Sequence, residues 1–142
     1  QETGATVHLG GTYVVMEGPA FSTKAESYLH RSWGADLIGM TALPEAKLAR
    51  EAEICYAIIA CVTDYDCWHE AHEAVTVEII LDTLRKNIDT SKRIIKLALG
   101  KIPEKRDCAC PSALKMSIVT PGELISEEQK KNLNLIIGKY IT

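Results

Sequence analysis

The sequence predicts an α/β fold in which helices flank a mixed, mostly parallel central sheet. β-rich runs alternate with segments of helical periodicity, in the order β-α-β-α-β-α. The most apolar segment, Ile54–Thr63, has no polar face, which is typical of a strand that helices cover on both sides. We therefore expect a layered sheet whose strands run largely in the same direction.

Turn and capping signals predict the N-terminal elements. Thr6–Leu9 and Thr12–Met16 are β-rich runs that form a strand pair, or one bent strand, on either side of a Gly-Gly pair. A helix is expected to begin after Thr23, because Glu26 lies at the spacing of a capping box. Gly34 is a natural end for that helix.

The remaining elements follow from the same kinds of signal. Pro44 suits the first turn of a second helix, and a capping box of Ser126 and Gln129 predicts the start of the last one. The expected elements are a strand at Asp36–Met40, a helix to about Ala52, the apolar strand Ile54–Thr63, a long helix at about Thr76–Lys101 and a final helix that ends near Tyr140. We predict a single domain over residues 1–142, with a helical tail at 104–142.

Composition and charge disfavour several classes of protein. The chain has 142 residues, 46% of them hydrophobic, and its net charge of −3 and pI of about 5.8 disfavour a nucleic-acid binder that relies on a basic surface. The longest unbroken apolar stretch, Ile54–Val62, is too short to cross a bilayer. Five cysteines without a secretory signal predict a cytoplasmic protein with mostly reduced thiols. We expect neither nucleic acid nor a membrane among its partners.

Three strand exits are the candidate binding segments, because ligands of such sheets bind at the carboxyl ends of the strands. They are Glu17–Ser22, Met40–Leu43 and Asp64–Trp68. In the first, Phe21 suits either stacking on a planar ligand or anchoring of the core. In the second, the Thr41 hydroxyl and a backbone amide suit an anion.

The third exit carries two carboxylates, Asp64 and Asp66, which point to the same side if the extended conformation continues. A carboxylate there either binds a ligand and carries a proton, or caps a polar turn. Together with His69 and His72, the two acids also form a candidate set of ligands for a divalent metal ion. The residues by themselves leave all three interpretations open.

The cysteines give weaker signals. Cys108 and Cys110 are separated by one residue, a spacing that matches neither a zinc knuckle nor a thioredoxin-type motif. Cys55, Cys61 and Cys67 lie on or after the apolar strand. A disulfide between this segment and the Cys108–Cys110 pair is possible, but it cannot be deduced from the sequence.

The three exits together resemble the carboxyl-terminal half of the 5′-methylthioadenosine phosphorylases, within the trimeric purine nucleoside phosphorylase family. The matching stretches are GGTYVVMEGPAFSTKAES, WGADLIGMTALPEAKLAREAEICYA and VTDYDCWHEAHEAVTVE, which cover Gly10–Glu78 almost without a break. The resemblance implies an incomplete nucleoside phosphorylase fold, because members of the family are considerably longer. It also implies a homotrimer or higher homo-oligomer that binds a purine nucleoside.

The resemblance further implies roles for individual residues at the positions that match the family's motifs. These residues are Phe21 (purine ring) with Ser22 beside it, Met40 (ribose), Thr41 (phosphate), Asp64 (purine N7 and 6-amino group), Asp66 (support of Asp64), and Val77 with Ile80 (5′-alkylthio pocket). No cofactor and no metal is implied, and phosphate is the co-substrate.

Three positions bear on the choice of substrate. Phosphorylases of 6-oxopurines carry Glu and Asn where this chain has Ser22 and Asp64, and an ionised carboxylate accepts hydrogen bonds, which suits a 6-amino group. Val77 replaces a His that contacts the 5′-hydroxyl in those relatives, so a methylthio group is favoured. The predicted reaction is reversible phosphorolysis of 5′-methylthioadenosine to adenine and 5-methylthioribose 1-phosphate, with protonated Asp64 as general acid at N7.

The half of the family's sequence that has no counterpart here supplies further phosphate-binding residues and strands. The chain by itself is therefore expected to expose apolar surface and to lack full activity. The alternative functions are phosphorolysis of methylthioinosine, purine binding without catalysis, and metal-dependent hydrolysis by the third exit.

Overall fold

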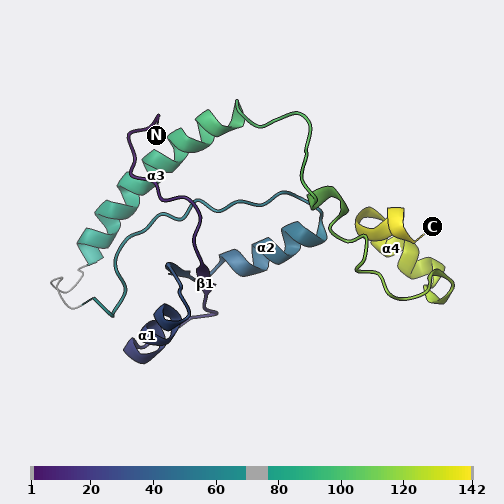
Figure 1. Ribbon diagram of the computed structural model, residues 1–142, viewed down its shortest axis with the longest axis horizontal. Coiled ribbons are helices and arrows are strands. Elements are labelled where there is room, and N and C mark those ends of the chain that lie inside the picture. The colour runs from purple at the N-terminus through teal and green to yellow at the C-terminus, as the bar shows by residue number, and fades with distance from the viewer. Residues whose placement is uncertain (1, 70–76, 142) are drawn as a thin grey trace. The chain divides into compact units, whose positions relative to one another are not determined.

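The structure is a computed structural model that describes residues 2–69 and 77–141. The chain divides into two compact units. The first contains residues 1–42 and 58–103, and the second contains residues 43–57 and 104–142. The expected tail, 104–142, thus shares the second unit with an earlier segment of the chain. Figure 1 labels the main elements.

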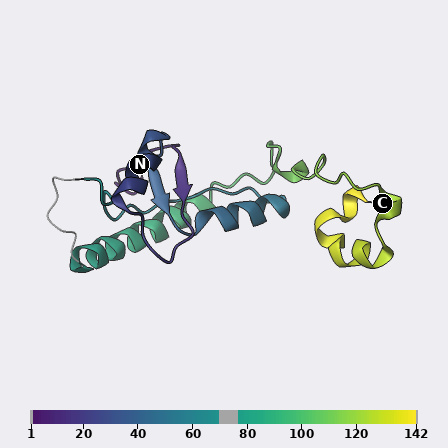
Figure 2. The ribbon, with the colours of Figure 1, turned by 90° about the horizontal axis from the view of Figure 1, so that it is seen from below.

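The first unit contains a parallel β-α-β arrangement. Strands β1 (Tyr13–Val15) and β2 (Leu37–Gly39) pair in parallel, with Val14 opposite Ile38, and helix α1 (Lys24–Ser32) connects them. The two strands are the adjacent arrows of Figure 2. The predicted parallel α/β organisation is confirmed, in an incomplete form.

Helix α1 begins and ends where its capping residues predict. The Thr23 side chain accepts a hydrogen bond from the Glu26 N–H, and the Glu26 carboxylate accepts one from the Thr23 N–H, so the expected capping box is present. After the last turn, Gly34 has a φ of +78°, a left-handed conformation that glycine adopts without strain. The N–H groups of Gly34 and Ala35 then close on the carbonyls of Arg31 and His30.

The prediction of two β-rich runs before α1 is correct for only one of them. Tyr13–Val15 forms a strand, whereas Thr6–Leu9 does not. Between the two runs, Gly10 and Gly11 both have positive φ values of 77° and 120°, which breaks the extended conformation. The pairing partner of β1 is β2.

The prediction of a buried strand at Ile54–Thr63 is wrong for this chain. The segment has no strand assignment, and its apolar side chains are exposed, with Ile54 at 58% and Val62 at 54%. A strand buried on both faces needs hydrogen-bonding strands beside it and packed layers above and below. Among the described residues, the sheet consists of β1 and β2, and neither pairs with this segment.

Helix α3 (Val77–Leu99) is the long helix predicted from the apolar periodicity. It contacts the end of the apolar segment within the first unit. The Asn87 amide donates to the Val62 carbonyl at 3.0 Å, and the Cys61 sulfur lies 3.0 Å from the Ser91 hydroxyl. Polar contacts with α3 thus fix the chain just before the third strand exit.

The second unit is organised around Glu53, which follows helix α2 (Ala42–Glu51) and is only 8% exposed. Its carboxylate accepts hydrogen bonds from the Leu114 N–H at 3.1 Å and from the Tyr140 hydroxyl at 2.5 Å, and it pairs with Lys139. Helix α4 (Glu127–Ile137) begins at the predicted capping box of Ser126 and Gln129. The other elements are the short 3₁₀ helices η1 (Cys110–Ser112), η2 (Gly122–Leu124) and η3 (Gly138–Tyr140).

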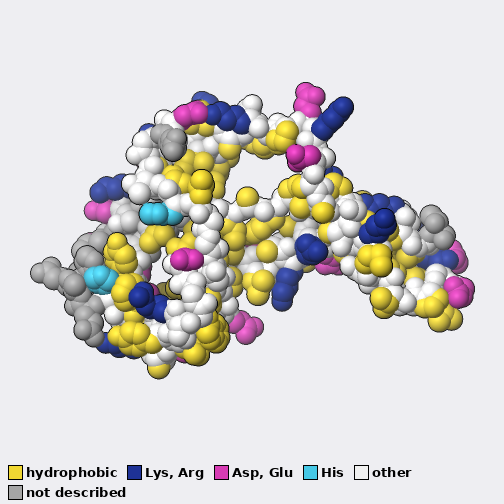
Figure 3. Space-filling view, viewed as in Figure 1, with side chains coloured by type: hydrophobic (Ala, Val, Ile, Leu, Met, Phe, Trp, Pro, Cys, Tyr) yellow, Lys and Arg dark blue, Asp and Glu magenta, His cyan; other side chains and the backbone are white. Residues whose placement is uncertain are grey.

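Few of the described side chains are buried. Ala42 and Ile141 are the buried apolar ones, and Ser27 and Glu53 are the buried polar ones. Apolar side chains reach the surface over much of the face drawn in Figure 3, as predicted for a chain with an incomplete sheet. None of the helices that the structure describes is long and apolar enough to span a membrane.

Candidate functional site

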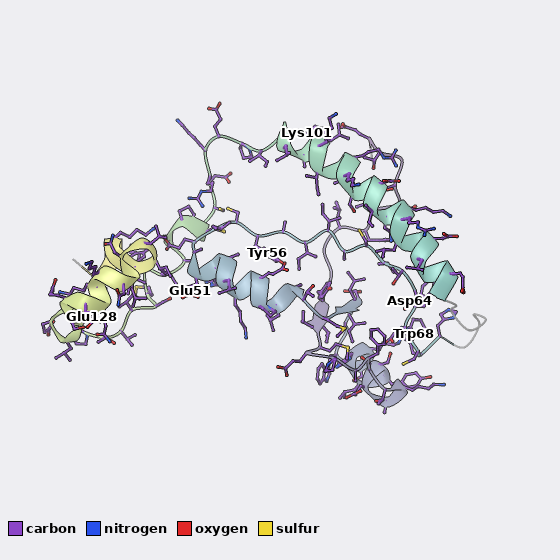
Figure 4. All side chains as sticks on the ribbon, turned by 180° about the vertical axis from the view of Figure 1, so that it is seen from behind. Glu51, Tyr56, Asp64, Trp68, Lys101 and Glu128 are labelled. Atoms are coloured by element: carbon purple, nitrogen blue, oxygen red, sulfur yellow. The ribbon has the colours of Figure 1, made fainter. Side chains whose placement is uncertain are left out.

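The loop after the apolar segment packs along helix α1, and this contact joins the first and third strand exits. The Ser27 hydroxyl, which is 2% exposed, donates to the Asp66 carboxylate at 2.6 Å. One turn further along α1, the Arg31 guanidinium lies 3.5 Å from the centre of the Trp68 ring. The Cys67 thiol donates to the Ser22 carbonyl at 3.7 Å. Three contacts therefore hold this loop, on which Figure 4 labels Asp64 and Trp68.

The two aspartates of this loop form a tight local turn. The Asp66 N–H donates to the Asp64 carboxylate at 2.9 Å, and the Thr63 hydroxyl donates to the other Asp64 oxygen at 2.7 Å. Asp66 has a φ of +60°, a conformation that Asp tolerates better than most residues. The extended conformation therefore ends at Asp66, so the sequence condition for both carboxylates to point the same way is not met. The Asp64 side chain remains exposed.

The second exit lies against the first. The end of the Met40 side chain lies against Gly18, whose φ of +73° is a left-handed conformation that favours glycine. Met40 is half-buried, whereas Thr41 beside it is exposed. Met40, the expected ribose-binding residue, thus lies against the segment that carries Phe21.

Phe21 is 83% exposed, so its interpretation as a core anchor is wrong for this chain. The neighbouring Ser22 is half-buried, and its hydroxyl lies 3.4 Å from the Met16 sulfur at the end of β1. Phe21 therefore projects from a fixed backbone with its ring accessible to a planar ligand. Its role as a purine contact stays a prediction.

The remaining predicted site residues are only partly described. Val77 and Ile80 lie in the first turns of α3, but their side chains are outside the described residues. His72 is outside them as well. Within the described ranges, Asp64, Asp66 and His69 do not form a group close enough to share a metal ion. The proposed four-residue metal site stays a prediction without structural support.

Two residues through which helix α1 contacts this loop were not predicted from the sequence: Ser27 and Arg31. A weak signal for Ser27 exists, because serine is an indifferent helix former and its presence inside α1 indicates another role. Arg31 gives no comparable signal, since a basic residue in the last turn of a helix is explained by the helix dipole.

Comparisons with known proteins match the chain to phosphorylases. The model of the phosphorylase superfamily matches residues 1–100. The S-methyl-5'-thioadenosine phosphorylase of Geobacter sulfurreducens is 57% identical over 141 residues, which are 99% of this chain and 49% of the relative. That of Koribacter versatilis is 54% identical, over 98% of this chain and 48% of the relative. The chain spans about half the length of these curated relatives.

Solved structures give the same result. A methylthioadenosine phosphorylase from an Antarctic soil metagenomic library matches with a TM-score of 0.80 and 47% identity, over 89% of this chain and 44% of that chain. A variant of the Schistosoma mansoni adenosine/methylthioadenosine phosphorylase, in complex with methylthioadenosine, matches with a TM-score of 0.61 and 39% identity. That match covers 74% of this chain and 35% of the other.

Proposed function

Because the chain belongs to the phosphorylase superfamily, we propose that it supplies the purine and 5′-alkylthio subsites of a 5′-methylthioadenosine phosphorylase. The observation that carries this proposal is that the three strand exits lie against one another. Ser27 joins α1 to Asp66, Cys67 contacts Ser22, and Gly18 lies against Met40. These contacts gather the segments that carry the expected purine, ribose and phosphate contacts.

In this reaction, phosphate attacks the anomeric carbon of the nucleoside while the bond to purine N9 breaks. The electron pair of that bond moves to the departing adenine, so negative charge accumulates on the base. A protonated Asp64 donates its proton to N7 and neutralises this charge, which is general acid catalysis. Asp66 holds the backbone turn that presents Asp64, and Ser27 in turn fixes Asp66.

The other subsites are assigned to the remaining motif residues. Phe21 packs against the purine ring, and its exposed ring is accessible for this contact. The Met40 backbone contacts a ribose hydroxyl, and the Thr41 hydroxyl donates to phosphate. Val77 and Ile80 provide an apolar surface for the methylthio group. The same surface would offer a 5′-hydroxyl no hydrogen-bond partner.

We also propose a homotrimeric assembly in the cytoplasm, in which the chain works together with the part that longer relatives possess. The exposed apolar side chains of both units are the surfaces available for such contacts. This assembly and this location rest on the relationship to the superfamily rather than on contacts within the chain.

The test is to complete the protein and measure its substrate preference. The chain is fused to the part of the Geobacter sulfurreducens relative that its alignment leaves unmatched, and adenine release from 5′-methylthioadenosine is followed with and without phosphate. We expect phosphate-dependent release by the fusion protein and little by the 142-residue chain alone.

Methylthioinosine serves as the matched substrate in the same assay. Because it differs at the 6-position, it isolates the contribution of Asp64 and Ser22 to base recognition. Preference for methylthioinosine would replace the proposed substrate with the 6-oxopurine. Base release that needs no phosphate, or robust phosphorolysis by the chain alone, would contradict the proposal.

A further inference from the structure

Three thiols from two distant segments meet in the second unit. Cys55 follows α2, whereas Cys110 is the first residue of η1 and Cys108 lies two residues before it. The three sulfurs lie within 4.8 Å of one another, and those of Cys55 and Cys108 are 3.4 Å apart. All three are free thiols, and no role in the proposed phosphorolysis uses them.

The local fold holds these segments together independently of the thiols. The Arg106 guanidinium donates to the Glu53 carbonyl at 3.0 Å, two residues before Cys55 and two residues before Cys108. On the other side of the cluster, the Leu114 N–H donates to the Glu53 carboxylate. The flanks of both cysteine segments are therefore fixed by the same residue, Glu53, so the sulfurs are preorganised.

We propose that Cys55, Cys108 and Cys110 form a three-thiolate site for Zn²⁺. Three sulfurs at about 2.3 Å from one tetrahedral zinc ion lie about 3.8 Å apart, so the observed cluster needs only small side-chain adjustments. Thiolates select soft ions such as Zn²⁺ over Mg²⁺ or Ca²⁺. The site differs from a zinc knuckle because one ligand comes from a segment 53 residues earlier in the chain.

The fourth coordination position is left to water. Among the described residues, no histidine or carboxylate joins the three sulfurs in a group close enough to share the ion. Cys110 borders a hollow of about 220 Å³ that is also lined by Arg50, Ile54 and Tyr56, which is ample room for a water molecule. The Arg50 guanidinium in this lining complements the negative charge that three thiolates give a zinc centre.

The test uses the 142-residue chain, reduced and kept under argon, and titrates it with Co²⁺ as a spectroscopic probe. A thiolate site gives an intense sulfur-to-cobalt charge-transfer band, and Zn²⁺ should abolish this band at about one ion per chain. Cys108→Ser should weaken Zn²⁺ binding by more than about 10- to 100-fold, because loss of a direct ligand costs more than loss of a residue that only hydrogen-bonds to a ligand. The far-ultraviolet circular dichroism of the variant checks that it is folded.

Cys61→Ser is the matched control, because Cys61 is also an exposed thiol but contacts Ser91 in the first unit. It should keep the cobalt band and the Zn²⁺ affinity of the parent chain. The absence of a band, or its survival in Cys108→Ser, would overturn the proposal. So would a Cys55–Cys108 disulfide, detected by mass spectrometry, in protein that takes up no Zn²⁺. None of these outcomes depends on the proposed phosphorolysis.

Discussion

Two carboxylates in the molecule, Glu53 and Asp64, have opposite surroundings. Glu53 is 8% exposed, and the donors to its carboxylate include Leu114 and Tyr140, which lie 61 and 87 residues away in the chain. Asp64 is exposed, and both of its donors, Thr63 and Asp66, lie within two residues. Glu53 therefore serves the fold, whereas the Asp64 carboxylate is accessible to a ligand.

The titration of Glu53 reflects its structural role. Burial by itself raises the pKa of this carboxyl, but hydrogen bonds from Lys139, Tyr140 and the Leu114 N–H outweigh burial and lower its pKa from 4.5 to about 2. The same contacts raise the pKa of Lys139 and that of Tyr140. The ionised form of Glu53 is thus part of the folded second unit.

The largest effect that we predict is on turnover, at Asp64. In the completed enzyme, Asp64→Asn should lower kcat for 5′-methylthioadenosine by about 10²–10⁴-fold, because the amide cannot supply the proton to N7. The free energy of unfolding should hardly change, since the carboxylate has only local partners. Steady-state kinetics and urea denaturation measure the two quantities. A near-parental kcat would remove Asp64 from the mechanism.

The second prediction concerns acid stability and Glu53. Because the pKa of Glu53 is lowered on folding, its contribution to stability is present above about pH 4.5 and is lost as the pH falls from 4.5 towards 2. Glu53→Gln should lower the stability of the chain at neutral pH and flatten its decline over this acid range. Urea denaturation from pH 2 to pH 7 measures both effects.

A surface carboxylate gives the control for this experiment. Glu123→Gln makes the same chemical change in the same unit, at an exposed position. It should reproduce the parental pH profile. An unchanged acid limb in Glu53→Gln would show that other groups carry the acid sensitivity.

The smallest effect that we predict is at Ser27, which connects the fold to the candidate site. Ser27→Ala removes a buried hydroxyl that donates to Asp66, and hydrogen bonds to charged groups contribute about 2 kcal/mol. The free energy of unfolding should fall by about that amount, and KM for the nucleoside should rise as the loop loosens. Ser32→Ala, at the exposed end of the same helix, is the control and should change neither quantity. Equal losses of stability in both variants would show that the contact with Asp66 is not their cause, and helix propensity would not explain them either, because alanine is the better helix former.

The sequence predicted those parts of the fold and site that depend on neighbouring residues. The capping boxes at Thr23 and Ser126 are present, and the apolar periodicity predicted α3. The strand exits were identified because turn residues and polar motifs follow β-rich runs. The prediction of a strand at Ile54–Thr63 was wrong. A segment that is apolar on both faces needs neighbouring strands and covering layers, and β1 and β2 do not pair with it.

The contacts that gather the site came only from the tertiary structure. Ser27 and Asp66 are 39 residues apart, and nothing in either segment specifies the other as its partner. The same holds for Cys55 and Cys108, which spacing rules did not connect.

Local sequence thus determined which segments become helices, where these begin, and which loops carry chemically useful side chains, since backbone conformation and capping involve residues a few positions apart. Only the tertiary structure decided that Asp66 docks on Ser27, that Glu53 is buried among distant donors and that three thiols share one place. Such contacts form when the chain closes long loops, and the free energy of each depends on burial and on geometry that no single segment contains.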